Sequence, residues 1–267
     1  MLPIYEAVSF QRVMSGGRTN PWLILANVNG QEKPYVVKLF NEIENDRREL
    51  VCKEVLGNAL ASEFGLIAPK AALIEMDSYF ESTINDHNAF FSYEFADQRT
   101  KFATELIYPF HEFTIGAHKA WQIKKSIEID SLFAYDNLIK NSDRGQARSN
   151  ILLKDKSAYL IDHELAFNID GGTLNDIITS NWDTNIYKRH IFFEFLKKST
   201  KATKLNYFIE FEEYLKYLDV NKFNGHLLQL RKEGYITKHH EYVLEYLDNV
   251  RKNSSNFVHL LKCLINK

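Results

Sequence analysis

The segment DRGQARSNILLKDKSAYLIDHELAF, residues 143–167, decides how this chain is interpreted. It places Asp143 before a short apolar run that begins at Asn150, and Asp162 directly after the returning run. Phosphoryl transfer from a nucleotide needs one carboxylate to accept a proton from the attacking hydroxyl. It also needs an amide and a second carboxylate to hold a divalent metal ion. The segment therefore predicts phosphoryl transfer, with Asp143 as the catalytic base and Asn150 and Asp162 as metal ligands.

Each of these residues also has an ordinary structural interpretation. Asp143 could terminate a helix, Asn150 could form a turn, and Asp162 could cap the next element. A functional interpretation gains weight because the residues occur in a fixed order at the ends of predicted elements, together with an upstream lysine and glutamate.

The upstream lysine is Lys38, which ends the apolar run 35–37. From the end of a strand its ammonium could reach a cleft and pair with nucleotide phosphates. Glu54, in the following helix, is predicted to pair with Lys38 and position it, and Glu49 is the alternative partner. Strand-end lysines and helix glutamates are often simply solvated. The hypothesis is that these side chains and those of the 143–167 segment converge in one crevice.

The turn at Ser15, Gly16 and Gly17 is a second candidate for nucleotide binding. Glycines let backbone N–H groups approach an anion closely, although the turn matches neither a Walker A loop nor GxGxxG, and a plain β-turn is the alternative. We also assign Tyr93 and Phe95, in a run expected to be a strand, to nucleotide binding.

Composition excludes several other classes of protein. The chain has 267 residues, of which 45% are hydrophobic and 25% charged, with a net charge of −2. The chain lacks the excess of positive charge that would indicate nucleic acid or a membrane surface as its main partner. Two separated cysteines, Cys52 and Cys263, predict neither a disulfide framework nor a zinc site. Without a signal-peptide pattern or a long apolar run, a soluble cytoplasmic protein is expected.

The order of predicted elements indicates an α+β protein. Expected strands cover residues 4–13, 22–28, 35–40, 71–75 and 89–95. Asn29-Gly30 predicts a turn between the second and third of these strands. A helix capped by Asp46 is expected to end at Gly65. Expected helices cover 102–110, 117–125 and 129–139, followed by a hairpin of 150–153 with 158–161 and amphipathic helices from 186 onward. The expected domains are a β-rich nucleotide-binding lobe, residues 1–96, and a helical catalytic lobe, residues 97–267.

Several of these motifs together resemble the HipA-like kinases, the bacterial branch of the protein-kinase-like superfamily typified by toxin kinases of toxin–antitoxin systems. The resemblance runs from about residue 12 to residue 168. It is carried by the turn 16–21, YVVK at 35–38, the helix and following segment 54–69, NSDR at 141–144, NILL at 150–153 and IDH at 161–163.

This resemblance implies a bilobal protein-kinase-like fold, with a small antiparallel β lobe carrying one main helix and a larger helical C-terminal lobe. It implies ATP and Mg²⁺ as ligands, with Lys38 on the phosphates, Glu54 bracing it, Asp143 as base, and Asn150 and Asp162 on the metal. The sequence departs from the better-known pattern in two places. Asp143 and Asn150 are seven residues apart, against about five in the protein-kinase loop, and Asp162-His163-Glu164 stands in place of Asp-Phe-Gly.

The expected function is therefore an ATP- and Mg²⁺-dependent kinase acting on a hydroxyl, with a protein Ser or Thr as the favoured acceptor. Two alternatives stay open at this point. One is a small-molecule kinase, and the other is a nucleotide-binding pseudokinase that acts as an interaction module. A protein substrate and an antitoxin or other regulatory protein are the expected partners, without a membrane or direct nucleic-acid role.

Overall fold

The computed structural model describes residues 1–15, 20–116, 123–169, 171–179 and 187–266. The chain forms two compact units, each assembled from separate stretches of sequence. The barrel unit comprises Met1–Leu56, Pro69–Tyr108 and Asn224–His240, and the helical unit comprises Gly57–Ala68, Pro109–Phe223 and Glu241–Lys267. The division of the chain into lobes 1–96 and 97–267 stays a prediction.

The barrel unit contains β1 (Ile4–Val13), β2 (Trp22–Val28), β3 (Gln31–Val37), β4 (Ala71–Glu75), β5 (Lys101–Glu105), α1 (Glu42–Arg48), α3 (Ser78–Ser82), α4 (His87–Glu94) and α11 (Asn224–Lys232). The helical unit contains β6 (His111–Glu112), β7 (Ile151–Lys154), β8 (Ser157–Leu160), α6 (Ile129–Leu138), α7 (Gly171–Thr179), η1 (Tyr187–Arg189), α8 (Phe193–Lys197), α9 (Lys201–Asn206), α10 (Ile209–Tyr217), η2 (Val220–Phe223) and α13 (Ser254–Asn266). Helices α2 (Leu50–Glu63) and α12 (Lys238–Lys252) each contribute residues to both units.

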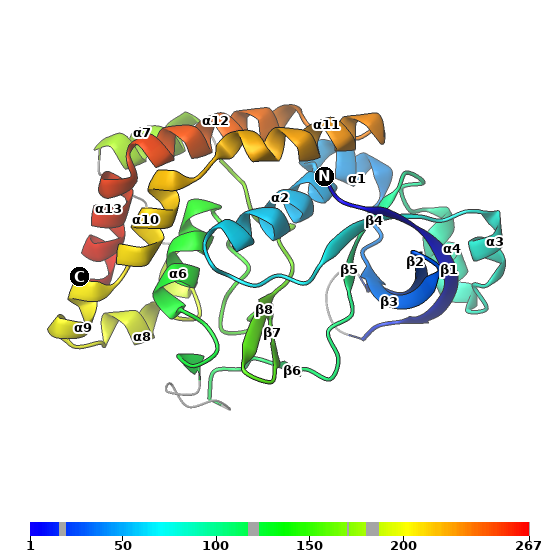
Figure 1. Cartoon of the computed structure of the whole chain (residues 1–267), viewed down its shortest axis with the longest axis horizontal. Helices are drawn as coiled ribbons and strands as arrows, with labels where there is room; N and C mark the ends of the chain where they lie inside the picture. Colours follow the sequence, from blue (N-terminus) through cyan, green and yellow to red (C-terminus); the bar gives the residue numbers. More distant parts are fainter. Residues whose placement is uncertain (16–19, 117–122, 170, 180–186, 267) are drawn as a thin grey trace. The chain divides into compact units, whose positions relative to one another are not determined.

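The barrel is closed in the order β1-β2-β3-β5-β4 (Figure 1). Its neighbouring strands run antiparallel except β1 and β4, which pair in parallel. The predicted turn between β2 and β3 is confirmed: Asn29 and Gly30 have φ of 54° and 83°. Positive φ at both central residues is the requirement of the tight hairpin turn that Asn-Gly favours.

Alternating side chains of the strands fill the barrel. Along β2, Trp22, Ile24, Ala26 and Val28 are buried, whereas Leu23 and Leu25 are partly exposed and Asn27 is exposed. The ring of Trp22 packs edge-on against Phe10 at 4.8 Å between centroids. Fully burying each large apolar side chain of this kind is worth roughly 1.5–3 kcal/mol. The core therefore holds the sheet from which Lys38 extends at the end of β3.

Residues 89–95 were expected to form a strand, and this prediction is wrong because they belong mostly to α4. The carboxylate of Asp86 accepts hydrogen bonds from the backbone N–H groups of Asn88 and Ala89, at 2.9 and 3.0 Å. This cap satisfies two of the donors that a helix start leaves unpaired. The local cap and the packing of Ala89 and Tyr93 against the barrel outweigh the strand preference of the aromatic residues.

Two further predictions are corrected in the barrel unit. Residues 102–110 were expected to be helical, but they contain most of β5, whose Phe102 and Ala103 are buried between β3 and β4. Asp46 was expected to cap a helix, but it lies inside α1, which Asn41 caps. Asp46 instead accepts a hydrogen bond from Arg99 at 2.6 Å. Most of the helix expected at 117–125 lies outside the described residues.

In the helical unit, the predicted helix 129–139 and the hairpin are confirmed as α6 and β7–β8. Aromatic side chains from separate helices form its core. The rings of Phe64 and Phe211 stack with centroids 4.4 Å apart, and Tyr135 of α6 lies 6.0 Å from Phe64. This packing fixes α6, and the segment that follows α6 carries the predicted catalytic residues.

Among the described helices, none has the length and apolar character needed to cross a membrane.

Candidate active site

Lys38 lies one residue beyond β3. Its backbone N–H donates to the carbonyl of Phe102 at 3.2 Å, which extends the pairing of β3 with β5 by one residue. The Lys38 ammonium forms an ion pair with the carboxylate of Glu54 on α2. The side chains are 14% and 2% exposed, respectively. A buried carboxylate next to an ammonium restricts where the lysine can point, so the sheet and the helix together position Lys38.

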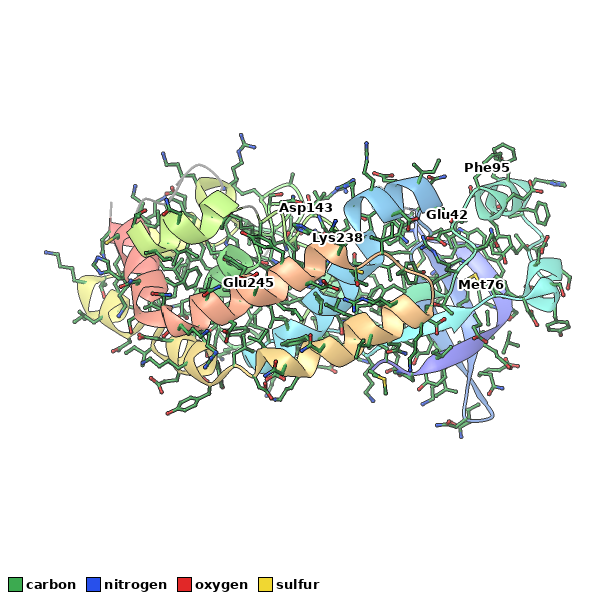
Figure 2. The ribbon with its side chains drawn as sticks, turned by 90° about the horizontal axis from the view of Figure 1, so that it is seen from above. Glu42, Met76, Phe95, Asp143, Lys238 and Glu245 are labelled. Carbon is green, nitrogen blue, oxygen red and sulfur yellow. The ribbon has the colours of Figure 1, made fainter. Side chains whose placement is uncertain are left out.

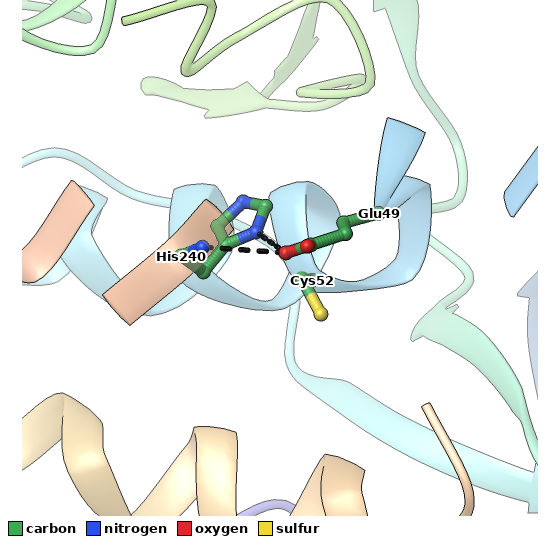
Figure 3. Close-up of side chains that lie close together, drawn as sticks. All are labelled: Glu49, Cys52 and His240. Carbon is green, nitrogen blue, oxygen red and sulfur yellow. Dashed lines mark hydrogen bonds and ion pairs between the residues drawn. The ribbon is translucent and has the colours of Figure 1, made fainter. Parts of the chain in front are cut away.

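Glu49, the alternative partner of Lys38, has a different role. It sits between α1 and α2 with φ of 49°. Its carboxylate accepts the backbone N–H groups of His239 and His240 at 2.8 and 3.3 Å and also pairs with the His240 ring (Figure 3). Burial raises the pKa of Glu49, but the hydrogen bonds from the His240 ring and the His239 backbone bring it below its ordinary value. Glu49 therefore caps the start of α12 as an ionised carboxylate.

Cys52 lies beside Glu49 and His240 in Figure 3. Its thiol donates to the carbonyl of Ile236 at 3.3 Å, and burial raises its pKa. A thiol kept protonated in this way is a poor nucleophile. The expectation that the cysteines form no zinc site stays a prediction.

The end of α6 begins the loop that carries Asp143. Lys140 adopts φ of 51°, and the backbone N–H of Asn141 donates to the carbonyl of Asp136 at 2.8 Å. This is the bonding pattern of a Schellman motif, with lysine in the left-handed position usually occupied by glycine. The motif ends the helix abruptly and fixes the direction in which residues 141–150 leave it.

A buried ion pair supports this loop from beneath. The guanidinium of Arg144 donates to Asp136 at 2.7 Å and to the carbonyl oxygens of Ser149 and Asn150 at 3.2 and 2.7 Å. The ring of His190 contacts the same Asp136 carboxylate at 3.0 Å. Burial raises the pKa of Asp136, but the charge of Arg144 and the His190 hydrogen bond together lower it below its ordinary value. Arg144 thereby ties the start of the loop to its end.

Asp143 and Asn150 are brought together by this loop. The side-chain nitrogen of Asn150 donates to the Asp143 carboxylate at 3.1 Å. The backbone N–H of Asp143 donates to the Asn141 side chain at 3.1 Å. Asp143 is half-buried, whereas Asn150 is buried and adopts φ of 50°. The longer interval in the sequence therefore still brings the acid and the amide within hydrogen-bonding distance.

Asp162 lies at the same end of the hairpin as Asn150. The backbone N–H of Ile161 donates to the carbonyl of Asn150 at 3.1 Å, directly beyond the last paired residues of β7 and β8. Asp162 follows with φ of 63°, and its carboxylate lies within 4.8 Å of that of Glu164. Carboxylate and amide oxygens are the ligands that Mg²⁺ prefers, so the donors at this end of the hairpin fit that ion.

A close contact fixes the residue after Asp162. A Cβ atom placed on Gly57 would lie 2.5 Å from the Cβ and Cγ of His163, which is closer than real side chains approach. Gly57 also accepts a hydrogen bond from the hydroxyl of Tyr135 at 2.6 Å. Because glycine has no side chain, His163 packs directly on the backbone at Gly57 and is 1% exposed. This contact positions the segment that carries Asp162.

The other residues assigned to nucleotide binding have varied surroundings. Ser15 is exposed in the turn after β1, whereas Gly16 and Gly17 lie outside the described residues. Tyr93 is buried in the barrel core, where its ring stacks on Trp22 with centroids 6.1 Å apart. Phe95 ends α4, is 61% exposed and projects outward (Figure 2). Contacts of these residues with a nucleotide stay predictions.

Sequence reasoning overlooked several residues on which the loop geometry depends. Asp136 and His190 both fell in segments predicted to be helical, and their contact joins positions far apart in the chain. Glu164 was noted only as part of the segment that stands in place of Asp-Phe-Gly, although its alternation with Asp162 could have suggested a second carboxylate on the same side. Gly57, a glycine inside a helix, could suggest close packing, but the sequence does not identify the packing partner.

Comparison with known proteins identifies similarity to kinases both in sequence and in fold. A family model described as HipA-like kinase matches residues 7–216. The crystal structure of a Helicobacter pylori proinflammatory kinase, CtkA, is similar in fold, with a TM-score of 0.54 and 13% sequence identity. That similarity covers 98% of this chain and 99% of the CtkA chain. No curated protein matches the sequence.

Proposed function

The chain belongs to the HipA-like kinase family, and we propose that it transfers the γ-phosphoryl group of ATP to the hydroxyl of a Ser or Thr in a protein. Membership of this family implies a phosphotransferase, and the α+β fold is that of a kinase. The observation that best supports the proposal is the hydrogen bond between Asn150 and Asp143, at the hairpin end that also carries Asp162.

In this proposal Asp143 is the catalytic base. Its carboxylate accepts the proton of the acceptor hydroxyl as that oxygen attacks phosphorus. The Asn150 hydrogen bond and the backbone bond to Asn141 hold Asp143 in one orientation. A fixed orientation matters because a base must lie within hydrogen-bonding reach of the proton that it removes.

Asn150 and Asp162 are the proposed metal-binding residues, with Glu164 as a further carboxylate. The Asn150 nitrogen faces Asp143, which leaves its side-chain oxygen for the ion. Mg²⁺, when bound, would offset the negative charge of the phosphates. Asp162 and Glu164 supply the anionic oxygens that such an ion requires.

Lys38 is proposed to hold the phosphates of ATP through its ammonium group, and Glu54 keeps Lys38 extended from the sheet. Their ion pair within the barrel unit supports this assignment. A lysine paired with a helix glutamate is also the arrangement that active protein kinases use to hold nucleotide phosphates.

The proposal is tested by following the label from γ-labelled ATP. The purified protein is incubated with Mg²⁺, labelled ATP and a dephosphorylated bacterial lysate, and proteins are then separated from metabolites. We expect label on Ser or Thr of proteins, with none transferred when EDTA is added and much slower transfer when Asp143→Asn replaces the wild type.

Other results of the same experiment would contradict the proposal in distinct ways. Label in a metabolite alone would identify a small-molecule kinase. Tight binding of ATP without transfer or hydrolysis would identify a pseudokinase that serves as an interaction module.

A further inference from the structure

A cavity of about 550 Å³ lies in the helical unit. Its walls are mainly apolar and include Ile191 and Phe195, and its rim carries Lys124, Lys198 and Glu194. Cavities of roughly 300–1,000 Å³ are large enough to enclose a small ligand or several side chains of a partner. None of the catalytic and metal-binding residues assigned above lines this cavity, so the proposed chemistry does not account for it.

The cavity adjoins the loop that carries Asp143. Gln146 of this loop lines the cavity. The loop is joined to the segment that carries Ile191, since the backbone N–H of Ile191 donates to the carbonyl of Arg144 at 3.0 Å and Gly145 bridges to His190. Because Gln146 follows Asp143 by three positions, their Cα atoms can be no more than about 11 Å apart. That is the span of about three residues of an extended peptide.

The cavity rim and its neighbouring helices are strongly basic. Residues 187–206 contain six basic side chains, at 188, 189, 197, 198, 201 and 204, and one acidic side chain, Glu194. Lys198 is 78% exposed. The Lys124 ammonium lies 5.2 Å from the centre of the Phe195 ring. This positive charge is local, because the whole chain carries a net charge of −2.

Positive charge alone would also suit a nucleic acid, but the apolar walls favour a protein. A single-stranded nucleic acid would need exposed aromatic faces on which its bases stack. The Lys124 ammonium already lies over one face of the Phe195 ring. An aliphatic side chain flanked by carboxylates would instead fill the apolar walls and pair with the basic rim.

We propose that this cavity is a docking site for the acceptor protein, and that it takes an acidic segment with an apolar side chain within about three residues of the phosphorylated Ser or Thr. The inference rests on the proposed function, because it specifies the substrate of the same site. It goes further by naming the sequence features that would select one Ser or Thr among many.

Direct binding tests the docking site without any phosphoryl transfer. The probes are short fluorescein-labelled peptides that contain one Ser and one Leu, three positions before or after it, with Asp residues beside the Leu. Fluorescence polarisation measures their affinity for the full chain in the absence of ATP. The two probes differ in whether the Leu stands before or after the Ser. We expect one of these two peptides to bind at least about fivefold more tightly than its matched peptides, in which Lys replaces Asp or Ser replaces Leu.

Variants of the rim should change this affinity in opposite directions. Lys198→Glu should weaken binding of the acidic peptide about fivefold, whereas Glu194→Gln should strengthen it about twofold, because it removes the one acid of the basic segment. Lys232→Glu, the same charge change on an exposed residue of α11, is the matched control and should leave the affinity unchanged. Both effects should shrink as the salt concentration rises from about 50 to about 500 mM.

The docking-site proposal would be overturned if the Asp and Lys peptides bound with equal affinity. It would also be overturned if Lys198→Glu and Lys232→Glu lost the same affinity for the acidic peptide. Tighter binding of a single-stranded oligonucleotide of matched length, lost in Lys198→Glu, would overturn the choice of a protein partner. Failure of the kinase proposal can be distinguished from failure of the docking-site proposal. If the acidic peptide binds as expected but no protein is phosphorylated, the docking site stands and the catalytic proposal fails.

Discussion

The guanidinium of Arg144 donates to the carboxylate of Asp136 over 2.7 Å, and the two side chains are 0% and 1% exposed. This pair joins the last turn of α6 to the loop that carries Asp143 and Asn150. Removing one partner of a buried ion pair leaves the other charge without compensation, which is among the most destabilising single changes in a protein.

Arg144→Met should therefore lower the free energy of unfolding by about 3–5 kcal/mol at pH 7. Urea denaturation followed by circular dichroism measures this change. Arg251→Met is the matched control, because Arg251 pairs with Asp248 on an exposed helix face and should cost less than about 1 kcal/mol. Similar losses in the two variants would show that the buried pair does not support the loop.

The same variant should reverse the pH dependence associated with Asp136. In the wild type, the lowered pKa of Asp136 contributes stability that is complete above its unfolded value and is lost as the pH falls through the folded value. Without the charge of Arg144, we expect burial to outweigh the His190 hydrogen bond and to raise the pKa of Asp136. Arg144→Met should then regain stability, relative to the wild type, as the pH falls from about 7 to about 5.

Lys101 should make folding stability depend on pH in the alkaline range. Burial lowers its pKa to about 8, although the ammonium donates to the Arg99 carbonyl at 2.6 Å. Between this value and about 10.4 the unfolded chain binds the proton and the folded chain does not, so this lysine's contribution to stability rises with pH. A shift of this size corresponds to an effect on the order of 3 kcal/mol.

The difference in unfolding free energy between wild type and Lys101→Met isolates this effect from other titrating groups. As the pH rises from 8 to 10, this difference should move in favour of the wild type by about 1–3 kcal/mol. A flat difference across that range would mean that Lys101 stays charged in the folded protein.

Gly57→Ala should disturb the segment that carries Asp162. The added methyl group would meet the His163 ring at 2.5 Å, so His163 or the helix must shift. We expect a loss of about 1–3 kcal/mol in stability and weaker Mg²⁺-dependent nucleotide binding, measured by calorimetry. Gly225→Ala is the control, since its nearest neighbour lies at 3.8 Å and alanine is favoured over glycine in helices. Unchanged magnesium dependence in Gly57→Ala would exclude this positioning role.

Glu54→Gln should weaken ATP binding by releasing Lys38. The substitution keeps the size of the side chain but removes the charge that pairs with the ammonium. We expect KM for ATP to rise about tenfold, with a smaller fall in kcat. Glu44→Gln, which disrupts a partly exposed pair with Arg48, should change neither constant. Equal kinetics in Glu54→Gln and the wild type would remove Glu54 from the site.

The sequence predicted elements best where local signals and packing agree. Asn29-Gly30 identified its hairpin, and the apolar spacing of 129–139 identified α6, because each pattern has one satisfactory structure. The strand prediction for residues 89–95 failed because an Asp cap three residues before Ala89 starts a helix, whereas the aromatic composition suggested a strand. The helix prediction for residues 102–110 failed because the strands that pair with this segment are distant in the chain.

The candidate site shows the same division. Lys38, Asp143, Asn150 and Asp162 could be proposed from their order and their places at element ends. Glu54 could also be proposed as the partner of Lys38, but Glu49 could not be excluded from the sequence. Its exclusion depends on its pairing with His240, nearly two hundred residues away. Likewise, the Asp136–His190 contact joins residues whose proximity depends on the fold of the whole helical unit.

The central claim is that Asp143 is the base of a phosphotransferase, and single-turnover kinetics of Asp143→Asn test it most directly. The rate of phosphoryl transfer from ATP should fall by about 10²–10⁴-fold, while the affinity for Mg²⁺–ATP, measured by calorimetry, should stay within about twofold of the wild type. Transfer at the wild-type rate in Asp143→Asn would contradict the account.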